Sequence, residues 1–142
     1  MKRIIRNILA VIIGALIGGI TNSAIIYLGP SLIEYPAGVD TTTVEGLKAA
    51  ADSLTAKHYV IPFLAHALGT LIGGFFAALL GVKKEGLLAI IVGSFFLIGG
   101  IVASFMIPAP TWFIFLDLLL AYIPMAWLGY KIKVAIINNK MG

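Results

Sequence analysis

The chain contains no cysteine among its 142 residues, which excludes disulfide bonds, thiolate metal sites and CxxC redox chemistry. Charged residues are also scarce. They make up 11% of the chain, whereas hydrophobic residues make up 61% and the mean hydropathy is +1.07. A soluble domain of this size needs many more ionised side chains to cover its surface. The composition therefore predicts an integral membrane protein.

The chain also lacks the motifs of common catalytic and binding sites. It has no HExxH or GxSxG sequence and no glycine-rich segment in the strand-to-helix setting of a phosphate loop. Its formal net charge is +4, but no basic run is interleaved with aromatic residues as in a nucleic-acid interface. We therefore expect no enzymatic activity, no cofactor, no metal site and no nucleic-acid partner.

Four long apolar runs are present, and each has about the 20 residues that a helix needs to cross a bilayer. They predict an all-α integral membrane protein in which residues 1–142 form a single membrane domain. Its four-transmembrane-helix bundle would have helices at 5–28, 61–82, 87–107 and 112–130, followed by a cytoplasmic tail at 131–142. Pro124 removes a backbone donor within the fourth helix and predicts a kink there.

The basic residues predict the orientation in the membrane. They gather before the first run, in the second loop and after the last run, at Lys2, Arg3, Arg6, Lys83, Lys84, Lys131, Lys133 and Lys140. Basic residues concentrate on the cytoplasmic side of membrane proteins. We therefore expect a multi-pass protein of the cell membrane with both termini cytoplasmic and residues 30–59 outside.

The first loop, residues 30–59, carries a helical pattern of its own. Thr42 precedes Glu45 by three residues, which is the spacing of a capping box. Apolar residues then follow at steps of three and four, which predicts an amphipathic helix of about three turns. This helix is either a connector or a cover over a site at the outer end of the bundle.

Small residues recur every four positions in the first three runs. Helices in lipid associate through small residues, which let backbones approach, and through polar groups. We expect helix packing through Gly14, Gly18, Gly69, Gly73, Gly81 and Gly93. The fourth run is bulky and aromatic, with Trp112 and Trp127 near its ends, so we expect it at the periphery, facing lipid or a second protomer.

Three polar side chains lie at similar depth within the runs. His66, Asn22 and Asp117 all fall roughly 6 to 9 Å beneath the outer interface, given a rise of about 1.5 Å per residue. An ionised carboxylate in contact with lipid is costly, so Asp117 must face the bundle, with His66 as its candidate partner. The predicted proton or ligand site comprises His66, Asp117, Asn22, Ser23 and Ser104. Tyr122 is expected to be an interfacial or packing residue instead.

These features support two main interpretations. In the first, the chain forms a homo-oligomer in the lipid bilayer and moves a small solute or ion through the titratable polar layer. In the second, it is a non-transporting accessory or assembly protein whose polar layer is structural. An intramembrane enzyme using Ser23 or Ser104 with His66 and Asp117 is a third reading, supported only by residue types. A cavity that reaches Asp117 from outside would favour transport over a structural role.

Overall fold

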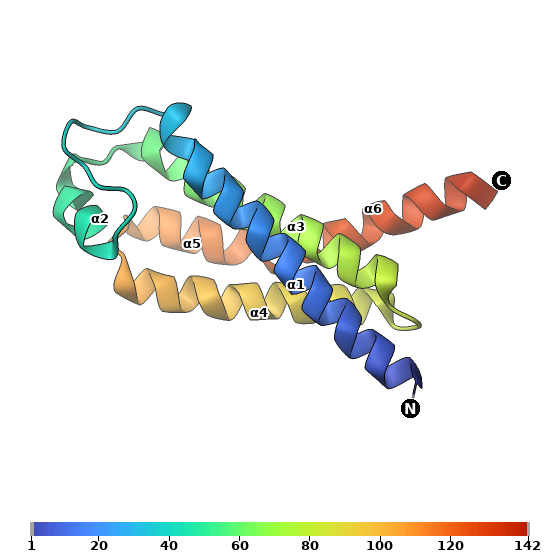
Figure 1. The fold of residues 1–142 in the computed structure, drawn as a ribbon. Helices are drawn as coiled ribbons and strands as arrows, with labels where there is room; N and C mark the ends of the chain where they lie inside the picture. The colour runs from blue at the N-terminus through green and yellow to red at the C-terminus, as the bar shows by residue number, and fades with distance from the viewer. Residues whose placement is uncertain (1, 142) are drawn as a thin grey trace.

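The structure is a computed structural model that describes residues 2–141, and every regular element in this range is a helix (Figure 1). The α-helices are α1 (Lys2–Leu28), α2 (Val44–Ala50), α3 (Val60–Leu80), α4 (Glu85–Met106), α5 (Thr111–Leu120) and α6 (Ile123–Met141). Four helical segments are long and apolar enough to cross a membrane, at Lys2–Ser31, Ala56–Leu80, Glu85–Met106 and Thr111–Ile137. The prediction of an all-helical chain with four long apolar helices is confirmed.

Helix α3 is the central element and packs against α1, α4 and α6 (Figure 1). The backbones of α1 and α3 lie very close together. A Cβ atom added to Gly14 would lie 2.6 Å from the carbonyl oxygen of Gly73, and one added to Gly18 would lie 2.6 Å from that of Gly69. Both distances are too short for any side chain. Gly81 lies beyond the end of α3, and a Cβ added there would meet the side chain of Leu88.

Helix α6 also packs closely on the bundle, so the expectation that the whole fourth run is peripheral is wrong. A Cβ atom added to Gly74 of α3 would lie 2.8 Å from the carbonyl oxygen of Ala126, and one added to Gly93 of α4 would lie 2.7 Å from the Ala126 Cβ. Ala126 is therefore the small residue that brings α6 against both neighbours. Helix α5, in contrast, leaves Phe115 and Leu119 exposed.

The fourth run is two helices, because α5 ends at Leu120 and α6 begins at Ile123. In a continuous helix the ring of Pro124 would clash with the carbonyl group of Leu120, and the proline has no N–H to donate to it. The disturbance predicted at this point is a two-residue break, Ala121 and Tyr122, within the long apolar segment Thr111–Ile137. Helix α6 then continues to Met141 through the segment expected to be a tail, since no glycine or proline interrupts residues 131–141. The predicted domain and tail also include residues 1 and 142, which lie outside the described residues.

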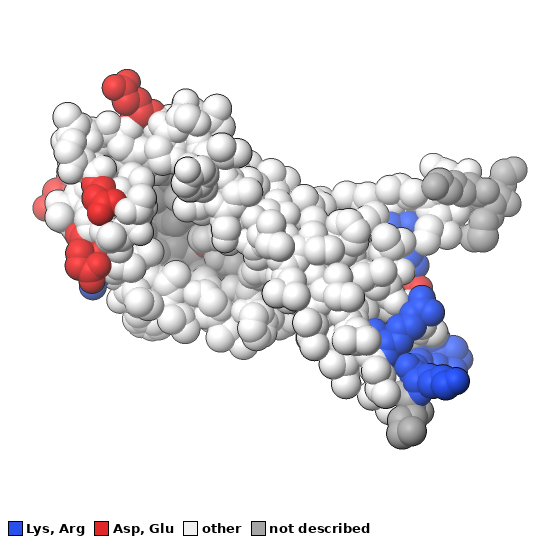
Figure 2. All heavy atoms as spheres, in the orientation of Figure 1, with Lys and Arg blue, Asp and Glu red and all other residues white. Residues whose placement is uncertain are grey.

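Charged residues occupy the two ends of the bundle, with an uncharged surface between them in this view (Figure 2). Many large apolar side chains of the long helices are exposed. The acidic residues Glu34, Asp40, Glu45 and Asp52 belong to the loop that joins α1 to α3, together with Lys48 and Lys57. At the opposite end are Lys2, Arg3, Arg6, Lys83, Lys84, Lys131 and Lys133, and there Lys133 forms an ion pair with Glu85. This distribution of charge and apolar surface suits a protein that crosses a bilayer.

Residues 29–59, which we call the long loop, fold over one end of the bundle (Figure 1). Its helix α2 has seven residues and continues directly into a 3-10 turn at Ala51–Ser53, so the two together give the predicted length of about three turns. Thr43, not Thr42, caps this helix by accepting a hydrogen bond from the Gly46 N–H at 3.1 Å. Thr42 instead donates its hydroxyl to Asp40 at 2.6 Å. Hydrogen bonds from Thr42, and then from Thr43, hold the pKa of the Asp40 carboxyl below its usual value.

Candidate functional site

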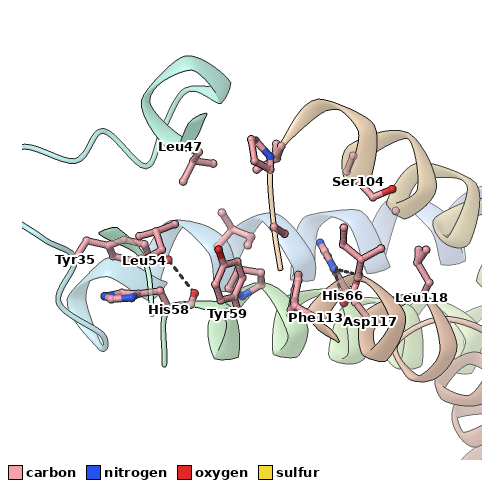
Figure 3. A pocket seen from close by; sticks show the side chains of 18 residues that line it. Tyr35, Leu47, Leu54, His58, Tyr59, His66, Ser104, Phe113, Asp117 and Leu118 are labelled. Atoms are coloured by element: carbon pink, nitrogen blue, oxygen red, sulfur yellow. Dashed lines mark hydrogen bonds and ion pairs between the residues drawn. The ribbon is translucent and has the colours of Figure 1, made fainter. Parts of the chain in front are cut away.

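A cavity of about 300 Å³ lies beneath the long loop, and we call it the loop pocket (Figure 3). Its roof comes from the loop and its walls from the adjoining ends of α3, α4 and α5. The lining residues include Tyr35, Leu47, Leu54, His58 and Tyr59 on the loop side and His66, Gly100, Ala103, Ser104, Phe113, Asp117 and Leu118 on the helices. The pocket is therefore mostly apolar, and its few polar groups lie at its two ends.

Asp117, His66 and Tyr122 form a hydrogen-bonded cluster at the end of the loop pocket that lies within the bundle. His66 Nδ1 lies 2.9 and 3.0 Å from the two carboxyl oxygens of Asp117, a contact drawn in Figure 3. The Tyr122 hydroxyl donates to Asp117 Oδ2 at 2.8 Å. Asp117 is only 5% exposed and Tyr122 only 2%. The carboxyl group is thus withdrawn from the surface and held by two side-chain donors.

The break between α5 and α6 brings Tyr122 to Asp117. In a continuous helix these two residues, five positions apart, would point about 140° away from each other, because each residue turns the helix by about 100°. The break removes this restriction. Gly100 of α4 makes room for the tyrosine, since a Cβ there would collide with the ring. Tyr122 packs in the core, which was one of the two roles expected for it. The hydrogen bond from its hydroxyl to Asp117 was not predicted. Pro124, two residues later, was the feature of the sequence that could have indicated it.

The other predicted site residues are placed differently. Ser104 lines the loop pocket, but its hydroxyl donates to the carbonyl oxygen of Ile101 on the same helix at 2.7 Å. Asn22 and Ser23 line a separate surface hollow with Thr41 and Thr42. A Cβ atom added to Gly69 would lie 2.9 Å from the Asn22 Cβ, so Asn22 faces α3 next to Gly69 rather than the pocket. Asn22, His66 and Asp117 therefore lie at similar depth in the bundle, but the side chain of Asn22 does not point toward the other two.

His58 fastens the roof of the loop pocket and was not singled out from the sequence. It is 4% exposed, and its Nδ1 accepts a hydrogen bond from the Thr55 backbone N–H at 2.8 Å. Its Nε2 lies 3.2 Å from the carbonyl oxygen of Glu34, which can only accept. An Nδ1 acceptor and an Nε2 donor together describe a neutral imidazole. The ring therefore ties the beginning of the long loop to its end.

Thr70 lies one turn deeper than His66 on α3 and is 1% exposed. Its hydroxyl oxygen is buried and has no hydrogen-bond partner among the residues that the structure describes. A buried hydroxyl without a partner is unfavourable relative to an apolar group of the same shape. Thr70 and Tyr122 thus both have buried hydroxyl groups, but only that of Tyr122 has a hydrogen-bond partner.

We expect Tyr122→Phe to lower the free energy of unfolding by about 1 to 3 kcal/mol, because Asp117 loses a buried donor. Thr70→Val should leave this free energy unchanged or raise it, because a methyl group replaces an unpartnered hydroxyl. Equilibrium unfolding of the detergent-solubilised protein measures both changes. Equal losses in the two variants would contradict the role given to the Tyr122 hydroxyl.

The carboxyl group of Asp117 and the imidazole of His66 are in direct contact, so the two can share a proton, which makes the cluster a candidate proton-binding site. A serine nucleophile would need its hydroxyl directed at His66, whereas that of Ser104 is bonded to its own helix. Within residues 2–141, no group of three or more His, Asp or Glu side chains is close enough to hold a metal ion. Comparisons of the chain with protein-family models, curated proteins and solved structures gave no match.

Proposed function

We propose that the protein is an integral membrane transporter of a small solute, in which the loop pocket binds the solute and the His66–Asp117 pair binds a proton. One observation carries this proposal: the same cavity is lined by the long loop and by the buried Asp117. An ion pair that only joined two helices would have no need of a cavity leading to it. A transporter needs such a connection between its titratable group and one side of the membrane.

The orientation that we propose places the long loop outside and both termini in the cytoplasm. It rests on the gathering of basic residues at the end of the bundle opposite the long loop, because such residues favour the cytoplasmic side. The homo-oligomer expected from the sequence stays a prediction.

Transport also requires the cluster to become accessible from the cytoplasmic side. The turn at Ala121 and Tyr122 is the place where we expect α5 to move relative to α6, because Pro124 has no N–H to donate to the preceding turn of helix. The hydrogen bond from Tyr122 to Asp117 crosses this break. We propose that a change in the protonation of the His66–Asp117 pair alters this bond and shifts the angle between the two helices.

A second candidate function is a non-transporting accessory protein in which the cluster only joins helices. The tight packing beneath the cluster favours it. Gly74 and Gly93 are both in close contact with Ala126, and Val92, next to Gly93 on α4, is fully buried against Ala77 and Leu88. The two candidates differ in whether this inner region ever opens to the cytoplasm.

Single-cysteine labelling distinguishes the two candidates, because the chain has no cysteine of its own. With a membrane-impermeant maleimide, we expect Lys48→Cys to react only from outside and Lys84→Cys only from inside. Val92→Cys introduces a smaller side chain at a fully buried position. In a transporter it should react from inside, at a rate that depends on pH.

The labelling pattern also tests the orientation. Reaction of Lys84→Cys from outside would reverse the proposed topology. A Val92→Cys protein that reacts from neither side at any pH, while the other two variants react as expected, would favour the accessory protein. Ser104→Cys serves as a reference for the loop pocket and should react from outside.

A further inference from the structure

The loop pocket combines apolar walls with one carboxyl group. Among the described residues that line it, Asp117 is the only acidic one and none is lysine or arginine. We infer that the solute of this pocket is an organic monocation with an apolar body, which replaces a proton held by the His66–Asp117 pair. The inference rests on the proposed function, because it names the chemical class of solute for the same pocket.

The charge balance of the cluster is the first argument. When His66 is protonated it neutralises the carboxylate of Asp117, with which it is in direct contact. When His66 is neutral, the pair carries one negative charge in mostly apolar surroundings, and an unbalanced buried charge is costly. An entering cation restores the balance. One proton leaves the imidazole for each cation bound, so the net charge of the occupied site does not change.

The other titratable groups around the pocket do not supply this positive charge. Tyr122, from the link between α5 and α6, donates a hydrogen bond to Asp117 and remains neutral. Tyr35 and Tyr59 belong to the roof, and burial raises the pKa of Tyr35. His58, also in the roof, uses Nδ1 as an acceptor and is therefore neutral. Helix α4 contributes Ser104, which does not titrate. The exchange therefore involves His66 and Asp117.

Aromatic rings provide a second argument. Tyr59 and Phe113 both line the pocket, with ring centroids 4.9 Å apart, and Tyr35 forms part of the roof. The faces of aromatic rings attract organic cations. A cavity of about 300 Å³ is at the low end of ligand pockets, which span about 300 to 1,000 Å³, so the solute is small.

The charge of the long loop is a third argument. Four acidic residues and two basic ones lie in it, and Figure 2 shows acidic groups at this end of the molecule. Hydrogen bonds keep the pKa of Asp40 low, so this carboxyl stays ionised. A negative surface around an entrance raises the local concentration of cations and lowers that of anions.

Calorimetric titration of the full chain in lipid nanodiscs tests the inference with three ligands of similar shape. They are benzyltrimethylammonium, its uncharged isostere neopentylbenzene, and the anion phenylmethanesulfonate, with empty nanodiscs as the blank for partition into lipid. We expect the cation to bind at least about tenfold more tightly than either of the others. Binding measured in two buffers of different ionisation enthalpy should show the release of up to one proton per cation, increasing as the pH is lowered and His66 becomes protonated.

Two variants distinguish the role of Asp117 in cation binding from the role of His66 in proton release. Asp117→Asn should weaken cation binding at least about tenfold, because it removes the negative charge that the cation balances. His66→Gln should keep cation binding and lose the proton release. Glu85→Gln, which alters a carboxyl group at the opposite end of the bundle, should bind the cation as the unaltered protein does.

The titrations can overturn the inference in several ways. Tighter binding of neopentylbenzene or phenylmethanesulfonate, binding of none of the three, or cation binding that Asp117→Asn does not weaken would overturn the inference. Cation binding to the unaltered protein with no proton release at any pH would do so even where Asp117→Asn does not fold. Cation binding with proton release, together with a Val92→Cys protein that never reacts from inside, would uphold the solute class and reject transport.

Discussion

Replacing Gly18 with leucine is expected to prevent the helix bundle from folding. A Cβ atom at this position would lie 2.6 Å from the Gly69 carbonyl oxygen and 3.1 Å from the Gly73 Cα, both of which are backbone atoms of α3. The helices would have to separate along most of their contact. We expect a loss of stability greater than the about 1 to 3 kcal/mol typical of an overpacked core, where side chains can shift instead.

The next residue provides a matched control. A Cβ atom added to Gly19 would have no neighbour within 4 Å, so Gly19→Leu adds the same side chain at an open position of the same helix. This variant should fold normally, and it gains from the better helix propensity of leucine. Size-exclusion profiles and thermal unfolding in detergent measure both variants. Comparable behaviour of the two would refute a close approach of α1 and α3 at Gly18.

Replacing Asp117 with asparagine is expected to preserve the fold and, if the proposed transport occurs, to abolish its pH dependence. The asparagine side-chain oxygen can still accept hydrogen bonds from His66 and Tyr122, so the cluster keeps its contacts. The negative charge that a protonated His66 would neutralise is lost. A proton that does not bind one conformation more tightly than the other cannot shift the equilibrium between them. Labelling of Val92→Cys from inside should therefore no longer vary with pH.

The matched control is Asp52→Asn, because Asp52 is an exposed carboxyl group in the long loop. Labelling of Val92→Cys should keep its pH dependence in this variant. If the cluster only joins helices, Asp117→Asn should instead lower the thermal stability, and the pH should affect labelling in neither protein. Proton-coupled uptake of benzyltrimethylammonium into proteoliposomes provides an independent readout, which Asp117→Asn should eliminate.

Much of the fold followed from local features of the sequence. The length and composition of each apolar run predicted four long helices, because a membrane-crossing segment is defined by its own residues. The position of Pro124 predicted a disturbance near Leu120, since the clash with proline occurs within a single turn. The extent of this disturbance was not predictable, because whether a helix bends or breaks depends on the contacts available to each half. Here Ala126 holds α6 against α3 and α4.

The candidate site was predictable only in part. The depths of His66 and Asp117 pointed to a shared polar layer, and the structure joins the two side chains. Asn22 lies at similar depth but faces Gly69, because the rotation of α1 about its axis places Gly14 and Gly18 against α3. The roof was also not predicted, since the contact of His58 Nε2 with the carbonyl oxygen of Glu34 joins residues 24 positions apart in the long loop.

The sequence by itself determined the all-helical class, the four long apolar helices, the two charged ends and the position of each polar residue along its helix. Only the tertiary structure decided which of these residues meet, where the fourth run breaks, and that a cavity connects the long loop to Asp117. The physical reason is that depth follows from position along one helix, at about 1.5 Å per residue. The direction of a side chain depends on how each helix is rotated against its neighbours, and close packing between helices sets that rotation.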